Sequence, residues 1–283
     1  MPSPSVVVAG PTTWNHLIEL DSLPEAIPHL EFARRSWWAV GGTSAGKAAH
    51  LAGLNARTTL VTPLGADAFG AQASAALART GATVVPLAGG ATESHVNLMT
   101  PAGERISLVT AVPCEPSEED VAAAASAILE ADAAFVDLSA LGLRLVAEPA
   151  VRARSLWVDL HDYDGDSAFH EPFVRVADVV FMNADRTDDP QQLMASCLRR
   201  GPRLAVCTLG ADGAICLTGD GELFRAPAVP VTVVDTNGAG DAFAAGFMMA
   251  TLGGAAPGEA LTAGARQAAV ALSTDALHPA LLG

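Results

Sequence analysis

The residues with the clearest chemical potential lie at 235–241, where the chain reads Asp-Thr-Asn-Gly-Ala-Gly-Asp. Val233 and Val234 before them are typical of the end of a strand, and residues 242–251 are typical of a helix. A glycine-rich turn that opens a helix points several backbone N–H groups at one place, beside the positive end of the helix dipole. The pattern predicts an anion site, in which Asp241 caps the helix and faces a bound phosphate as a general base. A plain strand–turn–helix with a capping aspartate is the alternative.

The same seven residues resemble D-T-x-G-A-G-D, the C-terminal signature of the ribokinase-like (PfkB) family of carbohydrate and nucleoside kinases. The resemblance implies that Asp241 is the catalytic base. It also implies that the N–H groups of Gly238, Ala239 and Gly240 form an anion hole for the transferred phosphoryl group, with Thr236 on the nucleotide side.

Composition narrows the classes of protein that this chain can be. Half of the 283 residues are hydrophobic, which is enough for a sizeable core, and no apolar run reaches the length of a membrane span. The net charge of −15 argues against nucleic acid or an anionic membrane as a partner, so local amides and a cation must hold any phosphate. Residues 1–10 lack a basic secretory segment and the four cysteines are scattered, which predicts a cytoplasmic protein.

The N-terminal part of the chain resembles the substrate end of the family, with two departures. The resemblance places a substrate-binding Asp five residues after Gly10, where this chain has Asn15. It also implies that the Gly41–Gly42 pair opens a helix over the sugar, and that the family Asn five residues after Gly41 is Gly46 here. Asn15 is uncharged, and Gly46 leaves extra room, so we expect a substrate that is bulkier or richer in acceptors than free ribose.

Residues 41–47 also fit the P-loop pattern G-x-x-x-x-G-K. A P-loop needs Ser or Thr at the next position to reach Mg²⁺, and Ala48 has no hydroxyl. We therefore interpret the stretch as the substrate-side signature and expect Lys47 to act on that side, if at all.

Two segments, about 13–42 and 92–110, are expected to form a small β-sheet lid. Paired tryptophans in the strand 36–40 indicate that one side of it covers something, and residues 94–100 and 105–109 flank a Gly-containing loop as in a hairpin. The resemblance implies that His95 and Asn97 face the substrate and that the lid edge pairs in a homodimer. An ordinary surface hairpin is the alternative.

The resemblance implies that residues at the ends of several expected strands bind the nucleotide and its cations. Asn183 matches the first position of the family motif N-x-x-E, but Arg186 replaces its Glu, so we expect Asp185 or Asp188 to order Mg²⁺ through water. Thr208, Gly210 and Gly213 match the family motif T-x-G-x-x-G, which lies against the nucleotide. A monovalent cation, usually K⁺, is implied near Asp235 and the terminal helix.

A further pair of polar residues follows the strand expected at 156–160. Ligands of open α/β sheets bind beyond the carboxyl ends of the strands, which would bring Asp159 and His161 to the site. A solvated acidic loop is the alternative.

Strands alternate with helices along the chain, which predicts an α/β fold: a doubly wound, mostly parallel sheet with helices on both faces and a small β-sheet lid, in a single domain of residues 1–283. The predicted function is an ATP-dependent kinase that transfers the γ-phosphate to a hydroxyl of a sugar-like or nucleoside substrate, with ATP, Mg²⁺ and K⁺. The alternatives are a non-catalytic ligand-binding or regulatory protein with a kinase-like fold and a P-loop nucleotidase.

Overall fold

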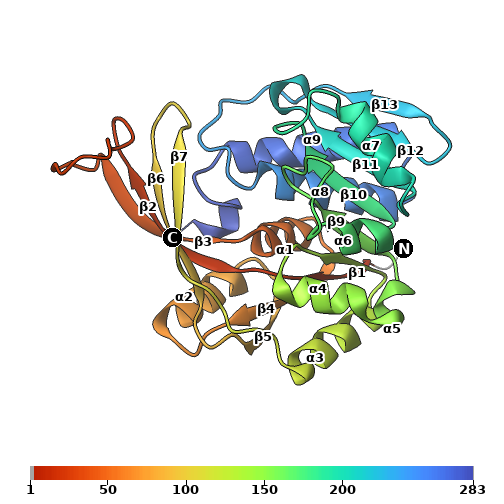
Figure 1. Ribbon diagram of the computed structural model, residues 1–283, viewed down its shortest axis with the longest axis horizontal. Coiled ribbons are helices and arrows are strands. Elements are labelled where there is room, and N and C mark those ends of the chain that lie inside the picture. The colour runs from red at the N-terminus through yellow and green to blue at the C-terminus, as the bar shows by residue number, and fades with distance from the viewer. Residues whose placement is uncertain (1–2, 283) are drawn as a thin grey trace.

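The computed structural model describes residues 3–282, which form a large sheet and a small one (Figure 1). The large sheet has nine strands in the order β13-β12-β11-β10-β9-β8-β1-β4-β5. All of its neighbouring pairs are parallel except β11–β12 and β12–β13. Its strands are β1 (Ser5–Ala9), β4 (Arg57–Leu64), β5 (Thr83–Ala88), β8 (Ala133–Val136), β9 (Leu156–Asp159), β10 (Val179–Asn183), β11 (Leu204–Thr208), β12 (Ala214–Thr218) and β13 (Leu223–Ala226).

Helices cover both faces of this sheet, and the short apolar strands divide their side chains between the two. Val6 and Val8 of β1 belong to one core cluster and Val7 and Ala9 to the other, as the two-residue period of a strand requires. The helices are α1 (Thr43–Gly53), α2 (Ala68–Ala78), α8 (Ala239–Leu252) and α9 (Pro257–Leu272) on the first side, and α3 (Glu118–Leu129), α4 (Ala140–Ala147), α5 (Pro149–Arg152), α6 (Glu171–Val176) and α7 (Pro190–Leu198) on the second. The predicted fold class is confirmed.

The small sheet has the order β3-β2-β6-β7 and stands beside the large layer (Figure 1). Its strands are β2 (Thr13–Glu19), β3 (Arg35–Gly41), β6 (Glu93–Met99) and β7 (Arg105–Ala111). Trp37 lines the cleft under this sheet, whereas Trp38 stacks on His16 with the ring centroids 4.4 Å apart. The sheet therefore has a cleft face and an outer face, as the paired tryptophans indicated, and we call it the lid.

Two of the helices begin with a side-chain cap. Ser117 forms a capping box with Asp120 at the start of α3, and Asp67 accepts a hydrogen bond from the Gly70 N–H at the start of α2. Within the described residues, no helix is both long and apolar enough to cross a membrane.

The expectations around the start of α8 need two corrections. Val233 and Val234 end no strand; they lie exposed in a loop, where the Val234 N–H donates to the Leu272 carbonyl at the end of α9 instead of to a sheet edge. Asp241 does not cap the helix. Gly238, with a φ of 76°, is the N-cap residue, and the Asp241 side chain turns into the interior.

Candidate active site

Four polar residues meet at the carboxyl-end edge of the large sheet. Asp159, Asn183 and Thr208 are the last residues of three consecutive neighbouring strands, and Asp137 follows the end of β8. This is the edge at which open α/β sheets bind ligands. The start of α8 adds Asp241, and α1 adds a lysine.

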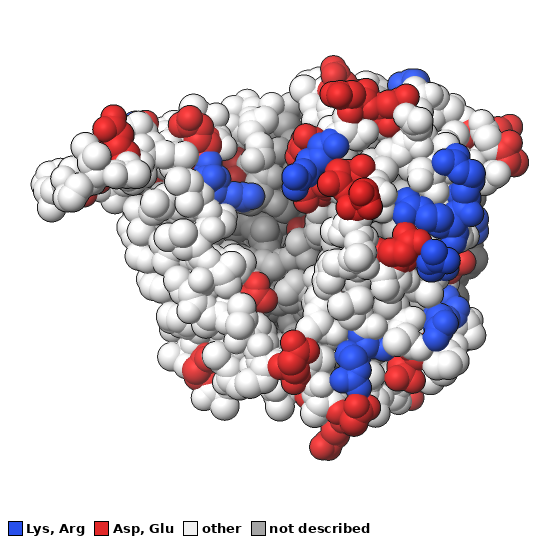
Figure 2. All heavy atoms as spheres, in the orientation of Figure 1, with Lys and Arg blue, Asp and Glu red and all other residues white. Residues whose placement is uncertain are grey.

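A cleft of about 1210 Å³ lies between this edge and the lid. Figure 2 shows the hollow between the lid and the body of the molecule. Alternate residues of the lid strands line it, because successive side chains of a strand point to opposite faces. They include Asn15, Leu17, Glu19, Arg35, Trp37, Glu93, His95, Asn97 and Met99.

A second cavity of about 500 Å³ adjoins the first and continues the site away from the lid. The two share Asp159, His161, Asn183, Asp185 and Gly240, so they are two parts of one site. The smaller part ends at the β11–β12 connection. A ligand that lies along both parts would span the distance from the lid to that connection.

Most residues that the sequence assigned to the site line these cavities. Those in the larger part are Asn15, Gly41, Gly42, His95, Asn97, Asn183, Asp185, Asp235, Thr236, Gly238, Gly240 and Asp241. Those in the smaller part include Thr208 and Gly210. Three others lie behind the walls: Gly46 packs against Asp241, Gly213 packs against Ala226, and the Ala239 N–H points at the Thr236 carbonyl at 3.4 Å.

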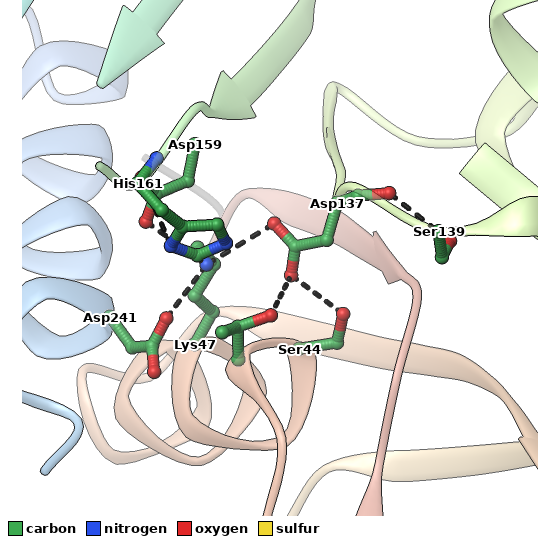
Figure 3. A network of polar contacts seen from close by, with 8 residues as sticks. Ser44, Lys47, Asp137, Ser139, Asp159, His161 and Asp241 are labelled. Atoms are coloured by element: carbon green, nitrogen blue, oxygen red, sulfur yellow. Dashed lines mark hydrogen bonds and ion pairs between the residues drawn. The ribbon is translucent and has the colours of Figure 1, made fainter. Parts of the chain in front are cut away.

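The centre of the site is an ion cluster that the sequence analysis did not predict. Lys47 of α1 is completely buried, and its ammonium Nζ lies 2.7 Å from Asp241 Oδ1, 3.2 Å from Asp137 Oδ1 and 3.3 Å from Asp159 Oδ2. Figure 3 shows the three carboxylates converging on the ammonium from three different elements. A P-loop lysine must be free to reach phosphates, and this ammonium is already enclosed by carboxylates.

Burial and charge act in opposite directions on the ionisable groups of this cluster. Burial raises the pKa of Asp241 to about 6, although the Lys47 ammonium opposes the shift. Burial also disfavours ionisation of Asp159, but His161 and Lys47 outweigh it and lower its pKa to about 2. Burial would lower the pKa of Lys47, yet the three aspartates hold it above its usual value. Lys47 therefore carries its charge at neutral pH, and Asp241 is a carboxylate that takes up a proton near pH 6.

Asp137 is held by α1 as well. Its Oδ2 accepts hydrogen bonds from the Ser44 hydroxyl at 2.6 Å and the Thr43 hydroxyl at 3.2 Å. The first turns of α1 thus supply two hydroxyls and an ammonium to one buried carboxylate. This arrangement fixes the helix relative to the sheet edge.

The turn before α8 forms part of the cleft wall. The first N–H groups of a helix have no partner within the helix. In α8 the Ala239 N–H donates to the Thr236 carbonyl, whereas Gly238 and Gly240 line the cleft wall. The neighbouring Asp235 carboxylate accepts from the backbone N–H and the side-chain amide of Asn237 at 2.9 Å each. Arg105 of the lid donates to the Asn237 side-chain oxygen, so the lid touches this turn directly.

Asn15 and Arg186, two of the three departures from the family pattern, lie in different surroundings. The Asn15 side-chain oxygen is buried and has no hydrogen-bond partner among residues 3–282. Such an atom is costly unless a ligand satisfies it. Arg186 turns toward Asp162, at 3.5 Å, whereas Asp185 faces both cavities.

The sequence alone did not place Lys47 and Asp137 in one ion cluster. Lys47 was expected to act on the substrate side, if at all, and no burial among carboxylates was expected, although a lone lysine in the alanine-rich helix after Gly42 is a polar residue on a buried face. Asp137 and Asp159 end two similar apolar runs, Phe-Val-Asp and Trp-Val-Asp. Because neighbouring strands place their ends side by side, that repeated pattern was the available signal.

Comparison with known proteins identifies the family to which the chain is similar. Residues 170–278 match the model of the family described as pfkB family carbohydrate kinase. The acarbose 7(IV)-phosphotransferase of Actinoplanes sp. is 34% identical over 223 residues, which are 76% of this chain and 74% of that protein. The nucleoside kinase of Methanothermobacter thermautotrophicus is 30% identical over 265 residues, which are 88% of this chain and 83% of that protein.

Solved structures show the same likeness over the whole fold. The microbiome-derived acarbose kinase Mak1 superposes with a TM-score of 0.85 at 27% identity, covering 96% of this chain and 93% of that one. The Arabidopsis thaliana ribokinase solved with ribose and ATP has a TM-score of 0.81 at 21% identity, covering 97% and 95%, and supports the fold alone. The identity shared with full-length kinases establishes that the chain belongs to the PfkB family of carbohydrate kinases and is an ATP-dependent phosphotransferase that acts on a hydroxyl of a sugar or nucleoside.

Proposed function

We propose that Asp241 is the general base of the transfer and that the backbone N–H groups of Gly238 and Gly240, which line the cleft, form the anion hole. The Ala239 N–H joins them when it leaves the Thr236 carbonyl. The observation that carries this is the single cleft in which Asp241, the turn and the polar face of the lid meet. The substrate O–H gives its proton to Asp241 while its oxygen bonds to the γ-phosphorus. The bond from phosphorus to the bridging oxygen breaks, and ADP leaves. The N–H groups stabilise the charge that develops on the phosphoryl oxygens.

The nucleotide occupies the smaller part of the site in this proposal. Asn183, Thr208 and Gly210 contact it there, and Thr236 contacts it from the adjoining larger part, whereas Gly213 shapes the loop from behind. Asp159, Asp185 and Asp212 line the smaller part, and Asp159 is already paired with Lys47. Asp185, which lines both parts of the site, would hold Mg²⁺ through water rather than as one ligand of a protein cage. Bound there, Mg²⁺ neutralises charge on the phosphates. Asp235, a carboxylate close to the end of α9, would hold K⁺.

The lid excludes water when substrate is bound, so that the hydroxyl of the substrate and not water receives the phosphoryl group. The contact of Arg105 with Asn237 supports this role, because it links the lid to the turn at which the phosphoryl group would lie. His95 and Asn97 lie on the cleft face, where they would contact the substrate.

The substrate that we propose is a glycoside of more than one ring. The cleft of about 1210 Å³ exceeds the roughly 300–1000 Å³ of most small-molecule pockets. It presents Trp37, one face of which is covered by the Arg35 guanidinium at 3.8 Å, as an aromatic surface, with polar groups around it. The relatives named for acarbose make that compound the first glycoside to test.

A turnover screen tests this substrate class. ATP-dependent phosphorylation would be followed with acarbose, a linear disaccharide, free ribose, free fructose and adenosine at equal concentrations. We expect kcat/KM for the best multi-ring glycoside to exceed that for ribose by at least about 10-fold, the loss expected when buried polar groups such as Asn15 stay unpaired. If ribose or adenosine is the best substrate, the proposed class is wrong while the kinase activity stands.

We also propose that the chain forms a homodimer through the lid. Apolar side chains on the outer face and edge of the lid, including Trp38, Ile106 and Leu108, are more than two-fifths exposed. Such a face is typical of an interface. Light scattering after size exclusion tests this: a single species at the monomer mass at all protein concentrations would contradict it.

A further inference from the structure

Lys47 is the only lysine of the chain, and every other residue of the Lys and Arg types is an arginine. It is also completely buried, between α1, the end of β8, the end of β9 and the start of α8. A compact ammonium can sit at a point between three carboxylates, whereas a planar guanidinium needs a larger, flat site. The single lysine therefore lies at a position where a compact ammonium fits and a guanidinium does not.

Burial of this ion cluster has an unfavourable desolvation free energy, which argues against a role in fold stability alone. Burying an ammonium and three carboxylates carries a large desolvation cost before pairing is counted, and hydrophobic residues of similar volume often stabilise a fold as well or better. Three carboxylates against one ammonium also leave an excess of negative charge. One of the three is the proposed base.

The cluster restricts how Asp241 can lie. Its Oδ1 is held by the Lys47 ammonium at 2.7 Å, and its Oδ2 lies against Gly46 one residue earlier in the same helix. Lys47 is itself fixed by Asp137 and Asp159, and Asp137 is fixed by Ser44. A continuous chain of contacts thus runs from the sheet edge to the base.

We propose that Lys47 is a positioning residue for the phosphoryl transfer, whose ammonium, anchored by Asp137 and Asp159, holds the Asp241 carboxylate in place and ionised beside the anion turn. The proposal rests on the role of Asp241 as base. The charged groups that face Asp241 are Lys47 of α1, Asp137 after β8 and Asp159 of β9, with His161 paired to Asp159 at 3.6 Å. Only Lys47 favours the ionised form directly.

Substitution of Lys47 by Met tests the proposal through the pH profile. Met preserves the apolar length and removes the charge, so the remaining aspartates raise the pKa of Asp241. We expect the acid limb of kcat/KM to move up by about one to three pH units, the effect of a nearby opposite charge on an aspartate. We expect kcat at the new optimum to fall by about 10²-fold through lost orientation. Lys47→Met combined with Asp159→Asn removes one repelling carboxylate and moves the limb part of the way back.

Arg200→Met is the matched control. Arg200 is a largely buried cation that pairs with Glu171 at 2.7 Å, outside the cleft, so its loss tests the general effect of deleting an interior cation. It should lower thermal stability without moving the acid limb. A Lys47→Met profile that coincides with the parent profile overturns the proposal. If Asp241→Asn is fully active, the base assignment fails instead, and the two failures are thereby distinguished.

A second measurement does not depend on the folding of Lys47→Met. Because the chain has one lysine, selective ¹⁵N labelling of lysine gives one side-chain resonance. We expect the Lys47 Nζ signal to be protected from solvent exchange and to titrate with a midpoint near pH 6, in step with Asp241. The step should vanish in Asp241→Asn. A Lys47 signal that ignores both the pH change and the Asp241 substitution overturns the proposal, even if Lys47→Met fails to fold.

Discussion

A Cβ atom built on Gly46 would lie 2.9 Å from Oδ2 and 3.1 Å from Cβ of Asp241. The family asparagine that this position lacks would therefore occupy the space in which Asp241 lies. The missing side chain does not widen the cleft directly; it accommodates the proposed base in its contact with Lys47. The room that we expected Gly46 to leave for substrate is filled by the protein.

Gly46→Ala is expected to lower kcat by about 10-fold, because the Asp241 carboxylate must give way by a few tenths of an ångström and a misplacement of about 1 Å can cost about 10²-fold. The helix itself gains from the substitution, since Ala is favoured over Gly within helices by roughly 0.5–1 kcal/mol. Activity should therefore fall while the melting temperature does not.

The control for that substitution is Gly258→Ala, a helical glycine of α9 whose Cβ would meet only Phe224 at 3.6 Å. It should leave kcat unchanged. Equal effects of the two substitutions on kcat would show that Gly46 has no special relation to Asp241.

The acid limb of kcat/KM in the parent enzyme is expected near pH 6. Asp241 must be ionised to accept the hydroxyl proton, and its raised pKa of about 6 means that it becomes protonated as the pH falls through that value. The rate should fall by about tenfold per pH unit below the limb. A limb near pH 4, the usual range of a solvated aspartate, would contradict the burial argument.

The fold followed from the sequence because its signals are local and repeated. Short apolar strands alternate with helices whose start signals, such as Ser117 with Asp120, lie next to each other in the chain. The anion turn could be proposed from the sequence for the same reason, because Gly238, Gly240 and Asp241 lie close together in the chain. The contact between Lys47 and Asp241 joins residues 194 positions apart, and no spacing rule reveals such a pair.

The prediction that Val233 and Val234 end a strand was wrong because a contact distant in sequence decides their conformation. The residue types favour a strand, but the segment runs past the end of α9, where the Leu272 carbonyl takes the Val234 N–H. Likewise, an aspartate in the first turn of a helix usually accepts from the N–H groups of that turn, whereas Asp241 pairs with the buried Lys47 instead. Local propensity is overridden in both places by tertiary contacts.

Gly213→Ala is expected to destabilise the fold. Gly213 has a φ of 91°, and its added Cβ would lie 2.1 Å from the Ala226 carbonyl oxygen. Backbone strain alone costs about 1–3 kcal/mol, and the clash adds to it. Gly221→Ala is the matched control, because its φ is also 91° with open space around it. Chemical denaturation should show the larger loss of unfolding free energy for Gly213; equal losses would mean that the close approach to Ala226 is not real.

Asn15→Asp tests whether Asn15 contacts the substrate. The buried Asn15 oxygen has no protein partner within residues 3–282, and the amide offers both a donor and an acceptor, whereas a carboxylate only accepts. The substitution should shift the ratio of kcat/KM values toward free ribose by about 10-fold or more, with ATP affinity unchanged. A constant ratio across the two substrates would remove Asn15 from the binding site.

The central claim is that Asp241 takes the proton of a hydroxyl that attacks ATP in this cleft. The most direct measurement is the single-turnover rate of phosphorylated product, identified by mass spectrometry, for the parent and for Asp241→Asn with the best glycoside of the screen. The variant keeps the shape and the Lys47 contact but not the base, so the rate should fall by about 10²–10⁴-fold with nucleotide affinity nearly unchanged. A variant that forms product at the parent rate would contradict the account.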